Sequence, residues 1–179
     1  LGRLLLPMLA SALVGVGFAA FFQFSPLLAE RRGGLAAGLL FTIYGLGIIA
    51  TRVLTGPLLD RWSIQRTLTL AATLLAGGLG LLALGGPPAG AAVAALLVAV
   101  GSGLSHPALL AHHAALLPAA PGRASAAFYI GFDLGIGLGS ALFGVALELG
   151  GLTGLYGAAA LLTLAALPLA PLLGRIGVR

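Results

Sequence analysis

Six long apolar stretches, separated by short runs of Arg, Asp, Pro or Gly, are the feature that most constrains the fold of this chain. Each is long enough to cross a bilayer core of about 30 Å, which needs about 20 helical residues. Hydrocarbon offers no partners for backbone polar groups, so each stretch is predicted to be a helix. Only 7% of the residues are charged and 60% are hydrophobic, which makes lipid the expected solvent. The sequence therefore predicts an all-α integral membrane protein with six transmembrane helices.

The predicted spans form a single bundle over residues 1–179. Their ends are set by charged, proline or glycine clusters that do not continue a helix in hydrocarbon. The third and sixth spans contain no acidic or basic residue, so we expect these two helices to face lipid. Apolar sequence begins at Leu1 without a cleavable signal, which is typical of a fragment of a longer chain. The spans cover residues 4–29, 35–59, 67–86, 91–117, 124–149 and 152–173.

The arginines provide an independent prediction of topology. Six crossings place both termini on one side of the membrane, and most of the nine basic residues, all Arg, fall on that side. Cytoplasmic loops carry the excess of Arg and Lys, so both termini are predicted to be cytoplasmic. The Lys-free composition, rich in Ala, Leu and Gly, favours a bacterial inner membrane. The arginines on the side of the termini are Arg3, Arg61, Arg66, Arg123, Arg175 and Arg179, with Arg31 and Arg32 opposite.

Several function classes are disfavoured by composition alone. The chain has no cysteine, which excludes disulfides, thiolate metal sites and cysteine nucleophiles. His112 and His113 are adjacent and have no acid beside them, so they do not form a metal set. The basic excess is a topology signal rather than a nucleic-acid footprint. We therefore expect no metal, no cofactor and no nucleic-acid partner, with the lipid bilayer as the main partner.

The stretch that joins the cytoplasmic end of the second span to the third carries the most specific motif, Arg52-x3-Gly56-x3-Asp60-Arg61-x4-Arg66. A glycine allows close approach of another helix, a carboxylate can accept from helix N-terminal amides, and arginines can donate to helix C-terminal carbonyls. Such a cluster is predicted to act as a breakable conformational latch. Alternatively, these are topology-setting arginines with one incidental acid.

This spacing resembles the signature of the loop between helices two and three of major facilitator superfamily (MFS) transporters, which recurs more weakly between helices eight and nine. Ser63 to Gln65 departs from the fuller signature of the amino-terminal copy, which favours the second copy. Two further segments resemble helix seven of the sugar- and drug-efflux branch and helix ten with its following loop. They are Phe24-Ser25-Pro26-Leu27-Leu28-Ala29-Glu30-Arg31-Arg32-Gly33 and Gly101-x-Gly103-x3-Pro107 followed by Pro118 and Gly122-Arg123-Ala124-Ser125-Ala126.

The resemblance implies the carboxyl-terminal half of such a transporter, a bundle of two inverted three-helix repeats that lacks its N-terminal half. It further implies proton-coupled efflux of a small organic molecule by alternating access, completed by the missing half or by a second copy, with Asp60 docked on the fifth helix of that half. One alternative is a membrane scaffold without transport activity. Another is an intramembrane enzyme built on Ser102, but no histidine follows Ser102 in a later span, so we expect no enzyme activity.

Asp133 is the only acid well inside a predicted span. An acid at the centre of a membrane helix costs about 2.5–3.5 kcal/mol on insertion scales, so it should face water or a partner. Its helix also carries glycines at four-residue spacing, which predicts close packing against another helix, and Asp133 lies about 160° away from that stripe. Asp133 is therefore a candidate proton or cation site, or else a structural acid. The packing glycines are Gly131, Gly135 and Gly139.

Other polar residues inside the spans are candidates for the same cavity. His106 precedes Pro107, whose missing amide weakens the helix and can expose a site, although a lone histidine there is also compatible with a structural role. Gln23, Tyr44 and Tyr129 can line a polar cavity, and Gln23 is the strongest of the three because tyrosines near span ends often serve as membrane anchors.

Overall fold

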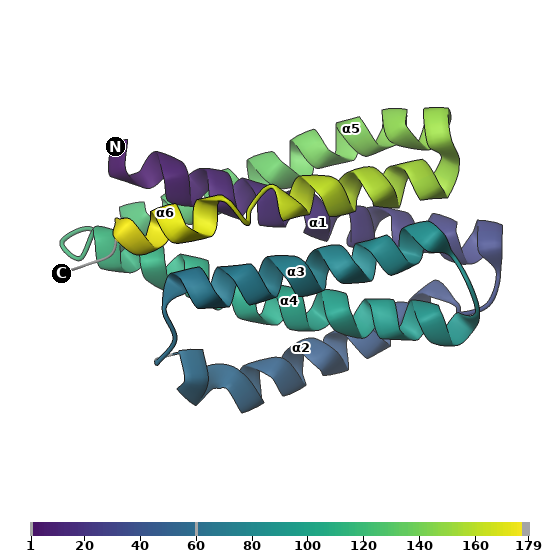
Figure 1. The fold of residues 1–179 in the computed structure, drawn as a ribbon, viewed down its shortest axis with the longest axis horizontal. Helices are drawn as coiled ribbons and strands as arrows, with labels where there is room; N and C mark the ends of the chain where they lie inside the picture. Colours follow the sequence, from purple (N-terminus) through teal and green to yellow (C-terminus); the bar gives the residue numbers. More distant parts are fainter. Residues whose placement is uncertain (1, 60, 177–179) are drawn as a thin grey trace.

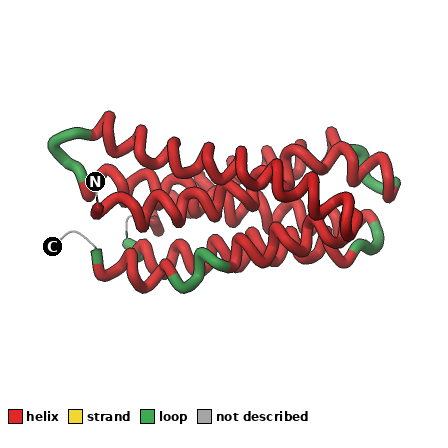
Figure 2. Tube along the Cα trace, turned by 90° about the horizontal axis from the view of Figure 1, so that it is seen from above, coloured by secondary structure: helices red, strands yellow, loops and turns green. Residues whose placement is uncertain are grey.

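A computed structural model describes residues 2–59 and 61–176, and every regular element in this part of the chain is a helix. The long helices lie side by side in an elongated bundle, and the chain starts and finishes at the same end of it (Figure 1, Figure 2). The prediction of an all-α fold is confirmed. The helices are α1 (Gly2–Arg32), α2 (Ala37–Leu59), α3 (Ile64–Leu84), α4 (Pro88–Leu116), α5 (Pro121–Leu164) and α6 (Leu169–Arg175).

The ends of the helices follow from local sequence. α3 begins after Ser63, whose hydroxyl accepts a hydrogen bond from the Arg66 amide at 3.3 Å, as an N-cap residue does. It ends at Gly85, which has a φ of 73° that glycine adopts without strain. Pro88 and Pro121 lie in the first turns of α4 and α5, where the missing proline amide costs no hydrogen bond.

The longest helix, α5, is folded back on itself. Gly151 has a φ of 60° and a ψ of −158°, and the chain reverses direction in this region (Figure 1). The first arm (residues 121–150) and the second arm (152–164) pack closely, since a Cβ on Gly154 would lie 2.9 Å from the carbonyl oxygen of Ala146. With α5 counted once, five helices are long and apolar enough to cross a membrane. The predicted count of six is therefore not confirmed.

The most extensive contact in the bundle joins α1 to α5. A Cβ on Gly135 would overlap the carbonyl oxygen of α1 that faces it, and a Cβ on Gly139 would lie only 3.2 Å from the Cα of Val16. Backbone therefore meets backbone along this interface, which small residues make possible in membrane helices. The three glycines of the stripe, Gly131, Gly135 and Gly139, face Met8, Ala12 and Val16 in that order.

Burial differs between the helices in a way that the charge pattern does not predict. In the most apolar window of each helix, 56% of the residues of α3 are buried but only 22% of those of α2. α3 contacts α1, α4, α5 and α6, whereas α2 rests mainly on α4. The expectation that the third span faces lipid therefore stays a prediction, since the remaining residues of its window are not buried. α2, which carries Arg52, has the smallest buried share of these helices.

Candidate functional site

A cavity of about 230 Å³ lies between α1, α2, α4 and α5. It brings together three candidates from the sequence, Tyr44, Arg52 and His106. Arg52 is exposed, so the cavity opens to the outside of the bundle at this residue. The lining consists of Val14 and Phe18 on α1, Tyr44, Ile48 and Arg52 on α2, Ser102, Ser105 and His106 on α4, and Phe132 on α5.

The polar groups of the cavity come from two helices and share one face of each. Tyr44 and Arg52 lie eight residues apart on α2, and Ser102, Ser105 and His106 follow a three-to-four-residue spacing on α4, which places them on one helix face. The Ser105 hydroxyl donates to the Gly101 carbonyl at 2.8 Å. The buried Ser102 hydroxyl has no hydrogen-bond partner among the described residues.

Aromatic rings form the opposite wall. The rings of Phe18 and Phe132 lie 5.4 Å apart, and the His106 ring lies 5.1 Å from that of Phe132, nearly perpendicular to it. His106 also contacts the buried Phe128 edge to face at 4.7 Å. α4 continues as a helix through Pro107, so the position of His106 is set by these rings rather than by unwound backbone.

The cavity lies deep within the bundle. His106 is 10 residues before the end of α4, which corresponds to about 15 Å at 1.5 Å per residue. Half the thickness of a bilayer core is also about 15 Å. A bundle that spans a membrane therefore holds this cavity near the midplane.

Asp133 and Gln23 do not line this cavity. Asp133 follows the lining residue Phe132, but it is exposed on the outer face of α5, and Gln23 is exposed on α1. Of the polar candidates besides Arg52 and His106, Tyr44 is the one that lines the cavity, and it is 6% exposed.

The latch motif is spread over the end of the bundle that holds the two chain termini. Asp60 lies outside the described residues. Gly56 has open space around its Cα, and with Trp62 and His112 it lines a second pocket of about 450 Å³. Arg61 and Arg66 are exposed. Arg52 is set apart from them, since it is seven residues before the end of α2, about 10 Å along the helix.

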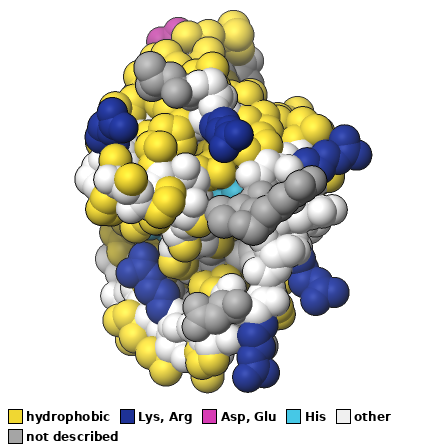
Figure 3. Space-filling view, turned by 90° about the vertical axis from the view of Figure 1, so that its left-hand side faces the viewer, with side chains coloured by type: hydrophobic (Ala, Val, Ile, Leu, Met, Phe, Trp, Pro, Cys, Tyr) yellow, Lys and Arg dark blue, Asp and Glu magenta, His cyan; other side chains and the backbone are white. Residues whose placement is uncertain are grey.

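Arginine side chains surround this end of the bundle, as Figure 3 shows in dark blue. The acidic side chains visible in that view lie at its upper edge. Besides Arg52, the exposed arginines in the helices and loops at this end are Arg3, Arg61, Arg66, Arg123 and Arg175.

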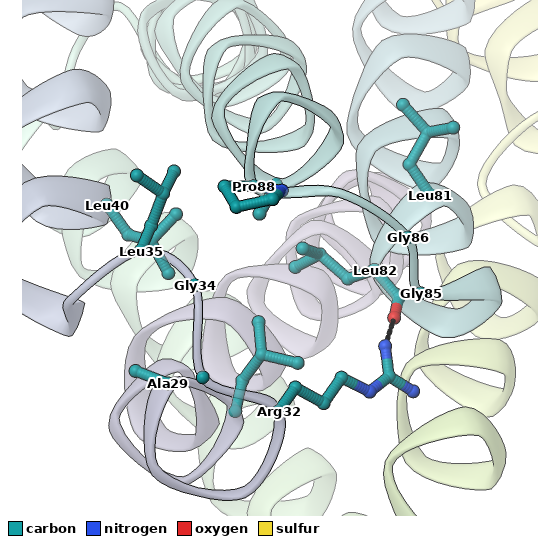
Figure 4. Close-up of a pocket in the computed structure, with 13 residues that line it drawn as sticks. Ala29, Arg32, Gly34, Leu35, Leu40, Leu81, Leu82, Gly85, Gly86 and Pro88 are labelled. Carbon is teal, nitrogen blue, oxygen red and sulfur yellow. Dashed lines mark hydrogen bonds between the residues drawn. The ribbon is translucent and has the colours of Figure 1, made fainter.

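A set of hydrogen bonds that the sequence did not predict joins three helices at the opposite end of the bundle. Arg32, the last residue of α1, donates to the carbonyl oxygen of Leu82 at 2.5 Å and to the Thr153 hydroxyl at 3.3 Å. Thr153 in turn donates to the carbonyl oxygen of Ala83 at 3.0 Å. We call this contact the Arg32 clamp, since it joins α1, α3 and the second arm of α5. It borders a pocket of about 330 Å³ between the Gly33–Gly34 and Gly85–Gly86 loops (Figure 4).

Most of the residues that line the cavity could have been identified from their helical spacing in the sequence. The polar lining residues are eight apart on α2 and three or four apart on α4, and Val14 and Phe18 are four apart on α1. The Arg32 clamp has no such signal, because its partners are 50 and 121 residues away. Within the described residues, no group of three His, Asp or Glu side chains is arranged to hold a metal ion.

Comparison with protein families gives one match over nearly the whole chain. The family model described as Major Facilitator Superfamily matches residues 7–177. A search of curated protein sequences gives no match.

Solved structures of peptide transporters share the fold. A structure of the peptide transporter POT in complex with sulfate is 20% identical, with a TM-score of 0.76 over 95% of this chain and 37% of the transporter. A mutant of POT in complex with alafosfalin is also 20% identical, with a TM-score of 0.80 over 98% of this chain and 40% of the transporter. The chain thus spans about two fifths of the length of these proteins.

Proposed function

Because the chain belongs to the major facilitator superfamily, we propose that it forms the carboxyl-terminal six-helix half of a secondary transporter that moves a small organic molecule by alternating access. Membership of this family assigns the chain to membrane transport rather than to enzyme catalysis. The observation that carries the proposal is the cavity at mid-depth, lined by four helices and open at Arg52. Transporters of this kind bind substrate near the midplane between two repeats or halves that rock against each other.

The proposal includes six membrane crossings. The two arms of α5 run in opposite directions from Gly151 (Figure 1), and each crosses the membrane, the second arm together with α6. The first and the last three crossings then form two inverted repeats. Both termini are cytoplasmic in the bacterial inner membrane. The exposed arginines near that end of the bundle support this orientation, because cytoplasmic segments carry the excess of basic residues.

The half-transporter assignment accounts for the uncovered surface of α2 and of the first arm of α5. Large apolar side chains are exposed on both, among them Leu46 and Val53 on α2 and Leu138 on α5. The missing half, or a second copy, covers these faces and closes the cavity. The latch motif lies at the end of α2, where Gly56 leaves open space for another helix. We place Asp60 with Arg61 and Arg66 in a contact that holds one access state, while Arg52 lies further along α2 and lines the cavity.

Asp133 is the proposed coupling residue for protons. It is exposed on α5 next to the cavity residue Phe132, and an acid at this depth needs water or a partner. In the complete transporter, Asp133→Asn is expected to abolish substrate-driven proton movement, since Asn cannot take up a proton. Inverted vesicles with an imposed pH gradient and a pH-sensitive dye measure this movement.

Glu148→Gln is the matched control for Asp133→Asn, because Glu148 is exposed near the far end of the same arm. It should leave proton movement unchanged. Proton movement that persists in Asp133→Asn at the level of the parent protein contradicts the coupling role.

The half-transporter proposal has its own test. The complete protein, expressed in an efflux-deficient bacterium, should raise tolerance to at least one small organic compound, and vesicles should then show saturable export of that compound. The isolated chain in proteoliposomes should show none, because alternating access needs a second half against which this one can rock. Saturable, gradient-driven uptake by the isolated chain as a monomer would overturn this assignment.

A further inference from the structure

We infer that the substrate is an organic anion, with a carboxylate or a similar planar acid group on an aromatic or branched apolar body. The inference rests on the proposed transport function and names the substrate class of the same cavity. It is carried by the lining of the cavity, which combines one arginine, several hydrogen-bond donors and aromatic walls, with no acidic residue.

The charge of the cavity is set by Arg52. The eight other lining residues include no acid. Asp133, which follows the lining residue Phe132, is exposed and does not line the cavity. A charged arginine at this depth is costly unless it meets water, a partner or a ligand. Its planar fork donates two parallel hydrogen bonds to a carboxylate. An anion is therefore the ligand that satisfies this part of the cavity.

Hydrogen-bond donors from two helices surround Arg52. Tyr44 is 6% exposed and lies two turns before Arg52 on α2. On α4, Ser102 is 5% exposed, and its hydroxyl lies close to the Tyr44 side chain but makes no well-formed hydrogen bond among the described residues. A buried hydroxyl without a partner costs free energy, and the second oxygen of a bound acid group can supply that partner. The polar side of the cavity thus has more donors than acceptors to offer.

The apolar side of the cavity accommodates a ring. Phe18 and Phe132 face each other at a centroid distance of 5.4 Å, tilted by 58°, and Ile48 and Val14 complete this wall. Aromatic rings gain about 0.5–1.5 kcal/mol from stacked or edge-to-face contacts beyond the burial of their area. The volume of about 230 Å³ equals that of roughly eight water molecules, which is close to one ring with one acid group.

A pair of fluorinated probes of the same size separates this proposal from binding of cations. The purified chain in phosphatidylcholine nanodiscs is titrated with 4-fluorobenzoate or 4-fluorobenzylamine at pH 7.5, and binding is read from fluorine NMR line broadening against empty nanodiscs. We expect saturable binding of the benzoate and binding at least about tenfold weaker for the amine, since a hydrogen bond to a charged group contributes about 1.5–3 kcal/mol.

Four variants assign the binding to Arg52. Arg52→Gln should weaken binding of the benzoate about tenfold or more, and Arg52→Lys should lie between it and the parent, because lysine keeps the charge without the fork. Tyr44→Phe should weaken it severalfold. Arg123→Gln, which removes an exposed arginine at the start of α5, should change nothing. Far-UV circular dichroism verifies the helix content of each, and Arg52→Lys and Tyr44→Phe carry the test if Arg52→Gln does not fold.

Several results would overturn the proposal: no saturable binding of the benzoate, equal binding of acid and amine, or unchanged binding in the folded Arg52 variants. These failures are distinct from failure of the transport function, because equilibrium binding needs no gradient and no second half. Export of a cation by the complete protein would leave transport standing and refute the substrate class. Binding of the benzoate without any transport by the complete protein would support the substrate class and refute the transport function.

Discussion

One methyl group at position 135 should separate α1 from α5: Gly135→Ala is expected to lower the free energy of unfolding by about 1–3 kcal/mol, the usual range for overpacking, or more. The added Cβ would overlap the carbonyl oxygen of Ala12. Because that atom belongs to a helix backbone, it cannot move aside as a side chain can. Unfolding of the purified chain in mixed micelles, followed over a range of denaturing detergent, measures the loss.

Gly137→Ala is the matched control for this prediction. Gly137 lies on the same arm of α5, and a Cβ there would meet nothing within 4 Å. Both substitutions gain the same intrinsic helix propensity, about 1 kcal/mol, so the difference between them isolates the interface. If the two variants are equally stable, the backbone contact between α1 and α5 does not hold the bundle together.

Arg32→Gln should loosen the end of the bundle opposite the chain termini. The guanidinium of Arg32 donates to two carbonyls at the end of α3 and to Thr153 on the second arm of α5, which glutamine cannot reproduce. Hydrogen bonds from a charged donor contribute about 1.5–3 kcal/mol, but Arg32 is exposed, so we expect a loss of about 1 kcal/mol. Hydrogen exchange should rise at the α3–α4 loop and at the start of the second arm.

Arg31→Gln removes the neighbouring exposed arginine and provides the control for the Arg32 clamp. It should leave exchange in both segments unchanged, because it keeps all three contacts of Arg32. Equal effects of the two substitutions would mean that the net positive charge of this end matters and the clamp does not.

The all-α fold follows from the sequence because lipid leaves the backbone few choices. Every apolar stretch must satisfy its own hydrogen bonds, and a helix does so within one segment. The glycine stripe was visible for a related reason, since a four-residue spacing defines one face of a helix. The number of membrane crossings follows less directly from the sequence. It depends on how the reversal at Gly151 is treated, because helical hydrogen bonding continues on both sides of that residue.

The candidate site was only partly predictable, because a helix face does not say which neighbour it meets. Arg52 and His106 line one cavity, whereas Asp133 and Gln23 are exposed outside it, and all four looked alike as polar residues in apolar spans. The low burial of α2 was missed for a different reason. Surfaces that face lipid and surfaces that face another helix are equally apolar, so the absence of charge from residues 67–86 does not say how much of that helix its neighbours cover.

The backbone contact between α1 and α5 also limits how the cavity can change its shape. Glycines have no side-chain rotamers that could adjust at this interface. We therefore expect Phe18 on α1 and Phe132 on α5 to move together as one rigid wall. The facing wall on α2, with Tyr44 and Arg52, rests mainly on α4, and the Tyr44 ring also contacts Phe21 and Phe22 on α1. The width of the cavity is therefore expected to change mainly through the distance of α2 from the other helices. A ligand bound to Arg52 acts directly on this helix, which has the smallest buried share of the long helices.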